Sequence, residues 1–131
     1  GTVTTVSTPS ITTYQDGSVT DNGIEYKSGK AINVTVTDTN GKVQTLAAGG
    51  TAVGSVAVYK FTDAINEAEI QVKGTTGATA VTGTVTDNMF TFTPATEGFY
   101  AIQYLTTAEN TATNTPAAYA YKVVYVKAAT K

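Results

Sequence analysis

Two acidic residues, Glu67 and Glu69, stand two positions apart and have a spacing suited to general acid and base chemistry. Alternation in residues 68–73 predicts a strand there, and residues two apart on a strand share one face. Their carboxyl groups would then lie roughly 7 Å apart, within the range of paired glycosidase carboxylates. The interpretation that we favour is a solvated face, because the same face carries Gln71 and Lys73.

Tyrosine rings crowd the last predicted strand, residues 117–127. Three of them fall on one face of this strand together with Val123, and a row of solvent-facing rings can stack against sugar rings. The interpretation that we favour is that these rings fill the core, because the opposite face of the strand carries Lys122. The candidate ligand platform consists of Tyr119, Tyr121 and Tyr125.

Five aspartates fall in predicted turns and loops, where carboxylate oxygens are available to bind calcium. Each also stands where an Asp side chain stabilises a turn by accepting hydrogen bonds from nearby backbone N–H groups. Because turn formation explains all of them, we predict no metal site and no cofactor. These residues are Asp16, Asp21, Asp38, Asp63 and Asp87.

The composition excludes several kinds of protein. The 131 residues include no Cys, His or Trp, so thiol catalysis, Ser-His-Asp chemistry and zinc sites of thiolates or imidazoles have no residues to use. Eight basic and ten acidic residues give a net charge of −2, so no basic field attracts nucleic acid. No apolar run approaches the length of about 18 residues that spans a membrane. We therefore predict a protein without enzymatic activity, nucleic-acid partner or membrane insertion.

The elements that position these residues are predicted to be strands, because Thr, Val and Tyr are abundant and helix-forming residues are scarce. Residues 30–38 alternate between apolar and polar side chains, and residues 56–61 are apolar enough to be covered on both faces. Residues 80–86 are predicted to form one strand, and a hairpin turn is predicted at 74–77. The only candidate for a short helical turn is 62–67. About seven to nine strands with regular turn signals predict a β-sandwich or barrel.

One domain is predicted over residues 10–128, preceded by a linker at 1–9 and followed by a C-terminal tail at 129–131. The linker prediction rests on the low complexity of the first residues and on Pro9. Few charges, no Cys and abundant Thr are typical of exported bacterial proteins. We therefore expect an extracellular or cell-surface location in a bacterium, with the periplasm as the alternative.

Residues 90–110, FTFTPATEGFYAIQYLTTAEN, resemble the C-terminal half of bacterial immunoglobulin-like domains of surface and secreted proteins. The matching positions are Phe92, Pro94, Gly98, Tyr100, Ile102 and Tyr104. The resemblance implies an all-β, immunoglobulin-like antiparallel β-sandwich with Greek-key topology. It also implies a tyrosine corner, in which the Tyr100 hydroxyl bonds to the backbone a few residues upstream. Ile102 and Val34 would occupy the positions of the two bridging cysteines of antibody domains, whereas Tyr59 stands where the family has a Trp.

The resemblance implies a non-catalytic structural or adhesion module of a bacterial cell-surface or secreted protein. Its partners would be neighbouring domains of a longer chain, together with a host or cell-wall glycan or protein. One alternative is a carbohydrate-binding module of a glycan-degrading enzyme, which exposed, coplanar tyrosines would favour. A second alternative is a decoration domain of a phage virion.

Overall fold

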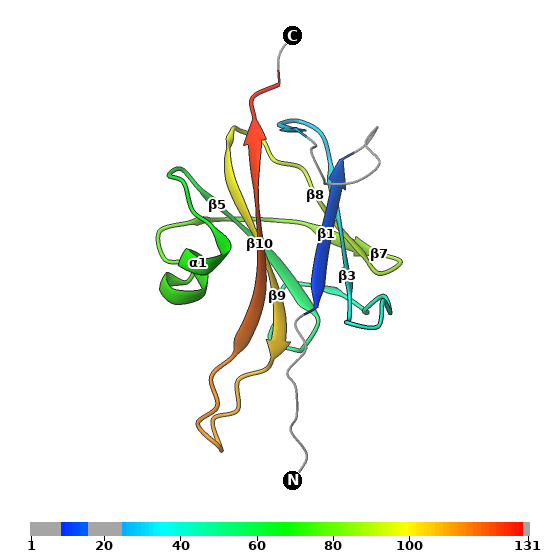
Figure 1. The fold of residues 1–131 in the computed structure, drawn as a ribbon, viewed down its shortest axis with the longest axis vertical. Coiled ribbons are helices and arrows are strands. Elements are labelled where there is room, and N and C mark those ends of the chain that lie inside the picture. The colour runs from blue at the N-terminus through cyan, green and yellow to red at the C-terminus, as the bar shows by residue number, and fades with distance from the viewer. Residues whose placement is uncertain (1–8, 16–24, 130–131) are drawn as a thin grey trace.

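The computed structural model describes residues 9–15 and 25–129, and over these residues the chain forms two stacked β-sheets with one short helix (Figure 1). The predicted linker, apart from Pro9, and the turn signals at 16–23 lie outside the described residues. No helix in the described part is long and apolar enough to cross a membrane. The elements are β1 (Ser10–Gln15), β2 (Tyr26–Lys27), β3 (Ile32–Thr37), β4 (Ala47–Ala48), β5 (Ser55–Phe61), α1 (Glu67–Lys73), β6 (Thr79–Val81), β7 (Thr84–Thr86), β8 (Met89–Phe92), β9 (Gly98–Thr107) and β10 (Ala118–Lys127).

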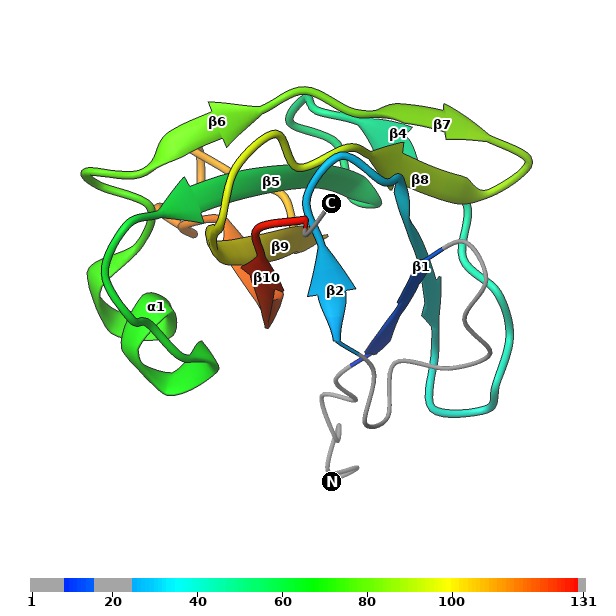
Figure 2. The same ribbon diagram turned by 90° about the horizontal axis from the view of Figure 1, so that it is seen from above.

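The first sheet has four strands in the order β1-β3-β8-β7, all antiparallel. The second has six, in the order β2-β10-β9-β5-β4, with β6 also paired to β5. It is strongly curved, so that β2 at its edge comes close to β1 of the first sheet (Figure 2). The prediction of an all-β protein with two sheets is confirmed. The expectation of purely antiparallel pairing is wrong, because β2 runs parallel to β10 and β4 runs parallel to β5.

The space between the two sheets holds the larger hydrophobic cluster, which we call the inter-sheet core. The predicted alternation in β3 is confirmed, because Ile32, Val34 and Val36 are fully buried. Phe90 and Phe92 of β8 enter from the same sheet, and Tyr100 and Ile102 of β9 enter from the other. The remaining buried members are Tyr26, Leu46, Val56, Val58, Tyr104, Val124 and Val126.

The segment predicted as one strand over 80–86 is two strands, β6 and β7, which belong to different sheets. Gly83 lies between them, and a Cβ atom at this position would stand 2.2 Å from Cζ of Phe90. Only a residue without a side chain lets the backbone pass this close to the ring. The chain therefore crosses from one sheet to the other at Gly83, above a phenylalanine of the core.

The prediction of a strand over 68–73 is wrong, because Glu67–Lys73 forms α1. The side chain of Asn66 caps the first turn by accepting a hydrogen bond from the Glu69 N–H at 2.9 Å. Gly74, with φ 71°, ends the helix and donates its N–H to the carbonyl of Ile70, so the predicted hairpin turn at 74–77 is wrong as well. Acidic residues in the first turn and a lysine in the last also favour the helix.

The helix packs on the outer face of the six-stranded sheet and encloses a second cluster, which we call the helix-side cluster. Its buried members are Phe61, Ile65, Ile70 and Ala101. Because Val56 and Val58 of β5 point into the inter-sheet core and Phe61 points to the helix side, β5 is covered on both faces as predicted. The Nζ of Lys73 lies 5.7 Å from the centroid of the Phe61 ring and covers the cluster from the helix.

Candidate functional site

The three tyrosines of the candidate platform lie on the outer face of β10, not between the sheets. The members of the inter-sheet core on this strand are Val124 and Val126, which alternate with the tyrosines. The interpretation that the rings fill the core between the sheets is therefore wrong. Tyr121 instead packs against the helix-side cluster, and Tyr125 is 39% exposed. Sequence alternation predicted that the three share a face, but it could not distinguish the inner face from the outer one.

The platform is not flat. The rings of Tyr119 and Tyr121 have centroids 5.9 Å apart and planes inclined by 45°. The hydroxyl of Tyr121 accepts a hydrogen bond from Nε2 of Gln103 at 2.9 Å, and burial raises the pKa of this tyrosine. Tyr125 stands beyond Val123 on the same face and packs on Phe99 instead, with centroids 4.8 Å apart and planes inclined by 51°. The three rings are thus divided into two tilted groups.

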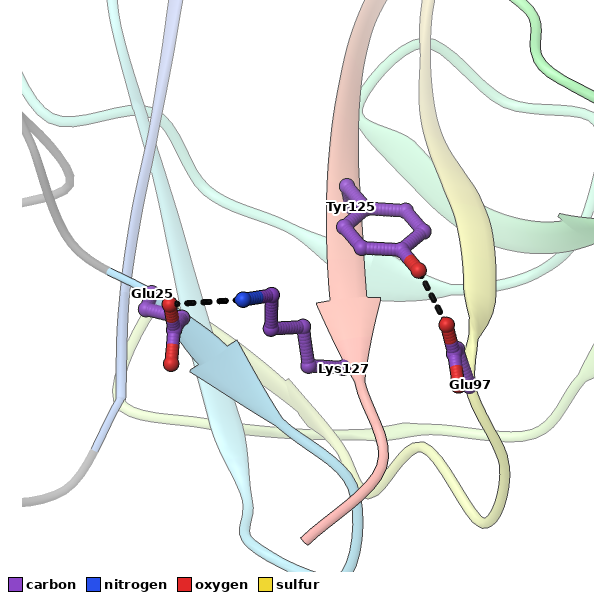
Figure 3. A network of polar contacts seen from close by, with 4 residues as sticks. All are labelled: Glu25, Glu97, Tyr125 and Lys127. Atoms are coloured by element: carbon purple, nitrogen blue, oxygen red, sulfur yellow. Dashed lines mark hydrogen bonds and ion pairs between the residues drawn. The ribbon is translucent and has the colours of Figure 1, made fainter.

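Two charged contacts flank the end of β10 (Figure 3). The hydroxyl of Tyr125 donates a hydrogen bond to Oε2 of Glu97, and this bond raises the pKa of the tyrosine. Nζ of Lys127 forms an ion pair with Oε2 of Glu25 at 3.1 Å, and both side chains are more than half exposed. The figure shows that the two pairs point to opposite sides of the strand, so they do not form one site.

The side chain of Tyr119 borders two hollows in the surface. One, of about 360 Å³, lies between α1 and the beginning of β10 and is lined by Ile70, Gln71, Lys73, Tyr119 and Tyr121, among others. The other, of about 310 Å³, is lined by Gly50, Leu105, Glu109 and Tyr119, among others. Gln71, which lines the first hollow, links α1 to β10, because its Nε2 donates to the main-chain oxygen of Tyr119 at 2.8 Å.

The acidic pair does not have the geometry expected from a strand. On α1 the side chains of Glu67 and Glu69 project in different directions, since residues two apart on a helix do not share a face. Oε2 of Glu67 accepts a hydrogen bond from the main-chain N–H of Val123 at 2.8 Å. Glu69 lies in the first turn of the helix and is exposed. The hypothesis of a strand-borne carboxylate pair is therefore wrong, and Glu67 instead contacts the edge of β10.

The described aspartates occupy turns. Oδ1 of Asp38 accepts hydrogen bonds from the N–H groups of Asn40 and Lys42 at 2.8 and 2.9 Å. Asp87, with φ 52°, forms the tight turn between β7 and β8, and Asp63 lies in a bend before α1. Asp16 and Asp21 lie outside the described residues. The described part of the chain brings no three acidic, His or Cys side chains together as metal ligands.

Tyr100 stands near the beginning of β9 with its ring in the inter-sheet core, stacked on Phe92 at a centroid distance of 5.9 Å. Its hydroxyl donates a hydrogen bond of 2.6 Å to the main-chain oxygen of Thr96, four residues upstream. The bond ties the turn before β9 to the strand itself. This is the geometry of a tyrosine corner.

Sequence reasoning missed two residues that shape this surface, Gln71 and Gln103. Gln71 depends on the helix, whose signals are present in the sequence: Asn66 followed three residues later by Glu69 is an N-terminal signature, and Gly74 after Lys73 is a C-terminal one. Gln103 has no local signal, because its partner Tyr121 belongs to the neighbouring strand.

Comparison with known proteins gives no relative. No family model matches the chain, and no curated protein and no solved structure matches it either.

Proposed function

We propose that this chain is a non-catalytic immunoglobulin-like module of a bacterial cell-surface or secreted protein, serving as a spacer or adhesive unit. The observation that carries the proposal is the strand order. The first sheet follows β1-β3-β8-β7, and the second contains β10-β9-β5. Taken in chain order, these match strands A-B-E-D and G-F-C of an immunoglobulin fold. The same assignment favours a Greek key, because the chain crosses between the sheets from β3 to β5, from β5 to β7 and from β8 to β9.

Two packing features support this assignment. The tyrosine corner formed by Tyr100 and Thr96 lies at the beginning of β9, the strand that corresponds to F. Val34 of β3 and Ile102 of β9 belong to opposite sheets and are both fully buried in the inter-sheet core. They occupy strands B and F, which a disulfide joins in antibody domains.

The direction of the chain supports a role as a spacer. In Figure 1, β1 begins a little below the middle of the molecule, and β10 ends near the upper end of its long axis. A domain whose chain enters and leaves at different levels of the long axis can be linked to its neighbours along that axis. The partners proposed for this module are therefore neighbouring domains, together with a glycan or protein of a host or cell wall.

The experiment joins two copies of the whole chain in tandem and compares this double-length protein with the single copy by small-angle X-ray scattering. We expect a tandem that is clearly longer along one axis and no wider in cross-section. Two copies that fold back side by side, with a maximum dimension close to that of one copy, would contradict the role as a spacer.

The alternative function as a carbohydrate-binding module has less support. The rings of Tyr119, Tyr121 and Tyr125 are tilted and fall into two separate groups, so they do not form one flat surface. A glycan array that includes cell-wall and host glycans tests it, with Tyr119→Ala as the matched variant. We expect no signal that depends on Tyr119. A glycan that binds the native chain and not the variant would favour this alternative over the spacer.

A further inference from the structure

One edge of β10 is largely without a strand partner. β9 pairs with β10 from Ala118 to Val126, whereas β2 pairs with it only at Val126 and Lys127. Within the described ranges, no strand therefore covers the second edge of β10 before Val126. An open edge presents backbone N–H and C=O groups that can pair with another chain.

The hydrogen bonds from α1 identify the groups that face this edge. The N–H of Val123 donates to Glu67, so it points away from β9. Main-chain groups of alternate residues point to the same side of a strand, so those of Tyr121 and Tyr119 face the open edge too. The carbonyl of Tyr119 accepts from Gln71, one helical turn after Glu67. Two side chains of α1 thus occupy one donor and one acceptor of the edge, on either side of Tyr121.

The two groups that α1 occupies are a donor, the N–H of Val123, and an acceptor, the C=O of Tyr119, so they can bond to each other across two copies of β10. If two copies of β10 pair antiparallel about a two-fold axis at Tyr121, the two Tyr121 residues exchange their N–H and C=O bonds. The next bonded pair joins Val123 of one copy to Tyr119 of the other. The N–H of Val123 then donates to the same carbonyl that Gln71 occupies in the single chain. The bonds from α1 therefore take the place of those that a second copy would make.

The strand carries little protection of its own along this stretch, because Lys122 is the one charged residue between Tyr119 and Val123. Natural edge strands commonly avoid pairing by means of charges or Pro. Residues 117–121, Ala-Ala-Tyr-Ala-Tyr, contain neither. Lys122 does not face the helix side, because it alternates with the outer tyrosines and pairs with Ile102 of the core. The outer side of the edge is protected by α1, which lies beside β10 in Figure 1 and bonds to the edge through Glu67 and Gln71.

We propose that the edge of β10 from Tyr119 to Val123 is a strand-pairing surface for a second copy of this chain, and that the Glu67 and Gln71 side chains of α1 keep it closed. The proposal does not depend on the function proposed above, because it concerns the hydrogen bonds of one strand. The two acidic residues of α1 then have different roles. Glu67 keeps the edge of β10 from pairing with another strand, and Glu69 has no part in this.

The test compares the double variant Glu67→Ala/Gln71→Ala with the matched control Glu69→Ala/Val72→Ala on the exposed part of the same helix. Ile70 remains in both variants to hold α1 on the sheet. Light scattering over a concentration series should give monomers for the native chain and the control, and dimers for Glu67→Ala/Gln71→Ala. Glu67→Gln should remain monomeric, since the amide oxygen still accepts from Val123. A folded double variant that stays monomeric at the highest concentration overturns the proposal.

Amide hydrogen exchange keeps the proposal testable if the double variant does not fold. The single variant Glu67→Ala should exchange the Val123 amide about tenfold faster than the native chain, because one charge-assisted hydrogen bond is lost. Glu69→Ala should leave that rate unchanged. An unchanged rate at Val123 in Glu67→Ala would show that the carboxylate does not guard the edge.

The register of the dimer can be checked by cross-linking, because the native chain has no Cys. Bonded antiparallel pairs have Cα atoms about 5.5 Å apart, within the range of a disulfide. When they are added to the double variant Glu67→Ala/Gln71→Ala, Tyr119→Cys and Val123→Cys together should give a covalent dimer on oxidation. The same two cysteines in a chain with Glu67 and Gln71 intact should not. A dimer that resists cross-linking would refute the pairing about Tyr121.

Discussion

The two hydrophobic clusters of this protein are built in different ways. The inter-sheet core takes its side chains from both sheets, and each of its strands alternates between buried and outward residues. The helix-side cluster takes its side chains from the outer face of one sheet and from α1, and several of its aromatic members remain partly exposed. The first cluster joins the two sheets to each other, whereas the second joins a helix to strands that already pair. We therefore expect loss of the first to unfold the chain and loss of the second to release only the helix.

The largest expected effect is that of Phe92→Ala. Phe92 is 2% exposed and lies in contact with both Phe90 and Tyr100. Removing the ring should lower the free energy of unfolding by about 3–5 kcal/mol, because a cavity remains between the sheets. Urea unfolding followed by circular dichroism measures the change. A loss below about 1 kcal/mol would mean that the inter-sheet core does not hold the sheets together.

Ile70→Ala should have a smaller and more local effect. The side chain is fully buried under α1, and its loss should cost about 2 kcal/mol, at the low end for such a change, because the adjoining hollow lets the site relax. Amide exchange should rise in α1 and remain unchanged in β3 and β8. Val72→Ala is the control: Val72 is 89% exposed, and this change should stay within about 0.5 kcal/mol. Equal acceleration of exchange in both sheets would remove the distinction between the two clusters.

The same difference explains which parts of the fold the sequence predicts. Strands that border only the inter-sheet core have one buried face, so the alternation of Ile32, Val34 and Val36 identifies both the strand and its inner side. The six-stranded sheet is covered on both faces near α1, and there the alternation of side chains does not distinguish the inner face from the outer one. Tyr119, Tyr121 and Tyr125 share a face as predicted, but only the position of α1 shows which face it is.

The sequence carries competing signals for α1: the alternation of its residues favours a strand, and the residues at its two ends favour a helix. Ile70 and Val72 alternate as in a strand, yet only Ile70 is buried. The capping residues Asn66 and Gly74 decide for the helix, since they satisfy backbone groups that a strand would not leave open. The pairs Gln71–Tyr119 and Glu67–Val123 join residues far apart in sequence, so no local pattern could predict them.

Tyr100→Phe tests a single hydrogen bond at the border of the inter-sheet core. Loss of the bond to Thr96 should lower the free energy of unfolding by about 1–2 kcal/mol with the ring packing intact. The matched control is Tyr125→Phe, which removes a hydroxyl bonded to Glu97 on the exposed face. We expect no measurable change for the control in the same urea titration. An unchanged unfolding midpoint for Tyr100→Phe would argue against a stabilising corner.

The smallest effect concerns alkaline pH and compares tyrosines of the two clusters. Burial raises the pKa of Tyr26 in the inter-sheet core, although its hydrogen bond with Thr13 at 2.6 Å acts in the opposite direction. Burial also raises the pKa of Tyr121 on the helix side. In the unfolded chain tyrosine titrates near its ordinary pKa of 10.0. Above that pH the unfolded state loses protons that the folded state keeps, so the free energy of unfolding should fall as pH rises from about 10.

Tyr26→Phe separates this contribution from that of Lys122. Burial lowers the pKa of Lys122 from 10.5, so the unfolded state keeps its proton longer, and this term raises stability with pH below that value. The variant retains the lysine and lacks one buried phenol. It should be less stable than the native chain at neutral pH, because Thr13 loses its partner, yet its stability should fall less steeply above pH 10. Urea unfolding at neutral pH and at several pH values above 10 measures both effects. Parallel pH curves for the variant and the native chain would mean that Tyr26 does not cause the alkaline loss, and Tyr104→Phe in the inter-sheet core and Tyr121→Phe on the helix side would then show which tyrosine does.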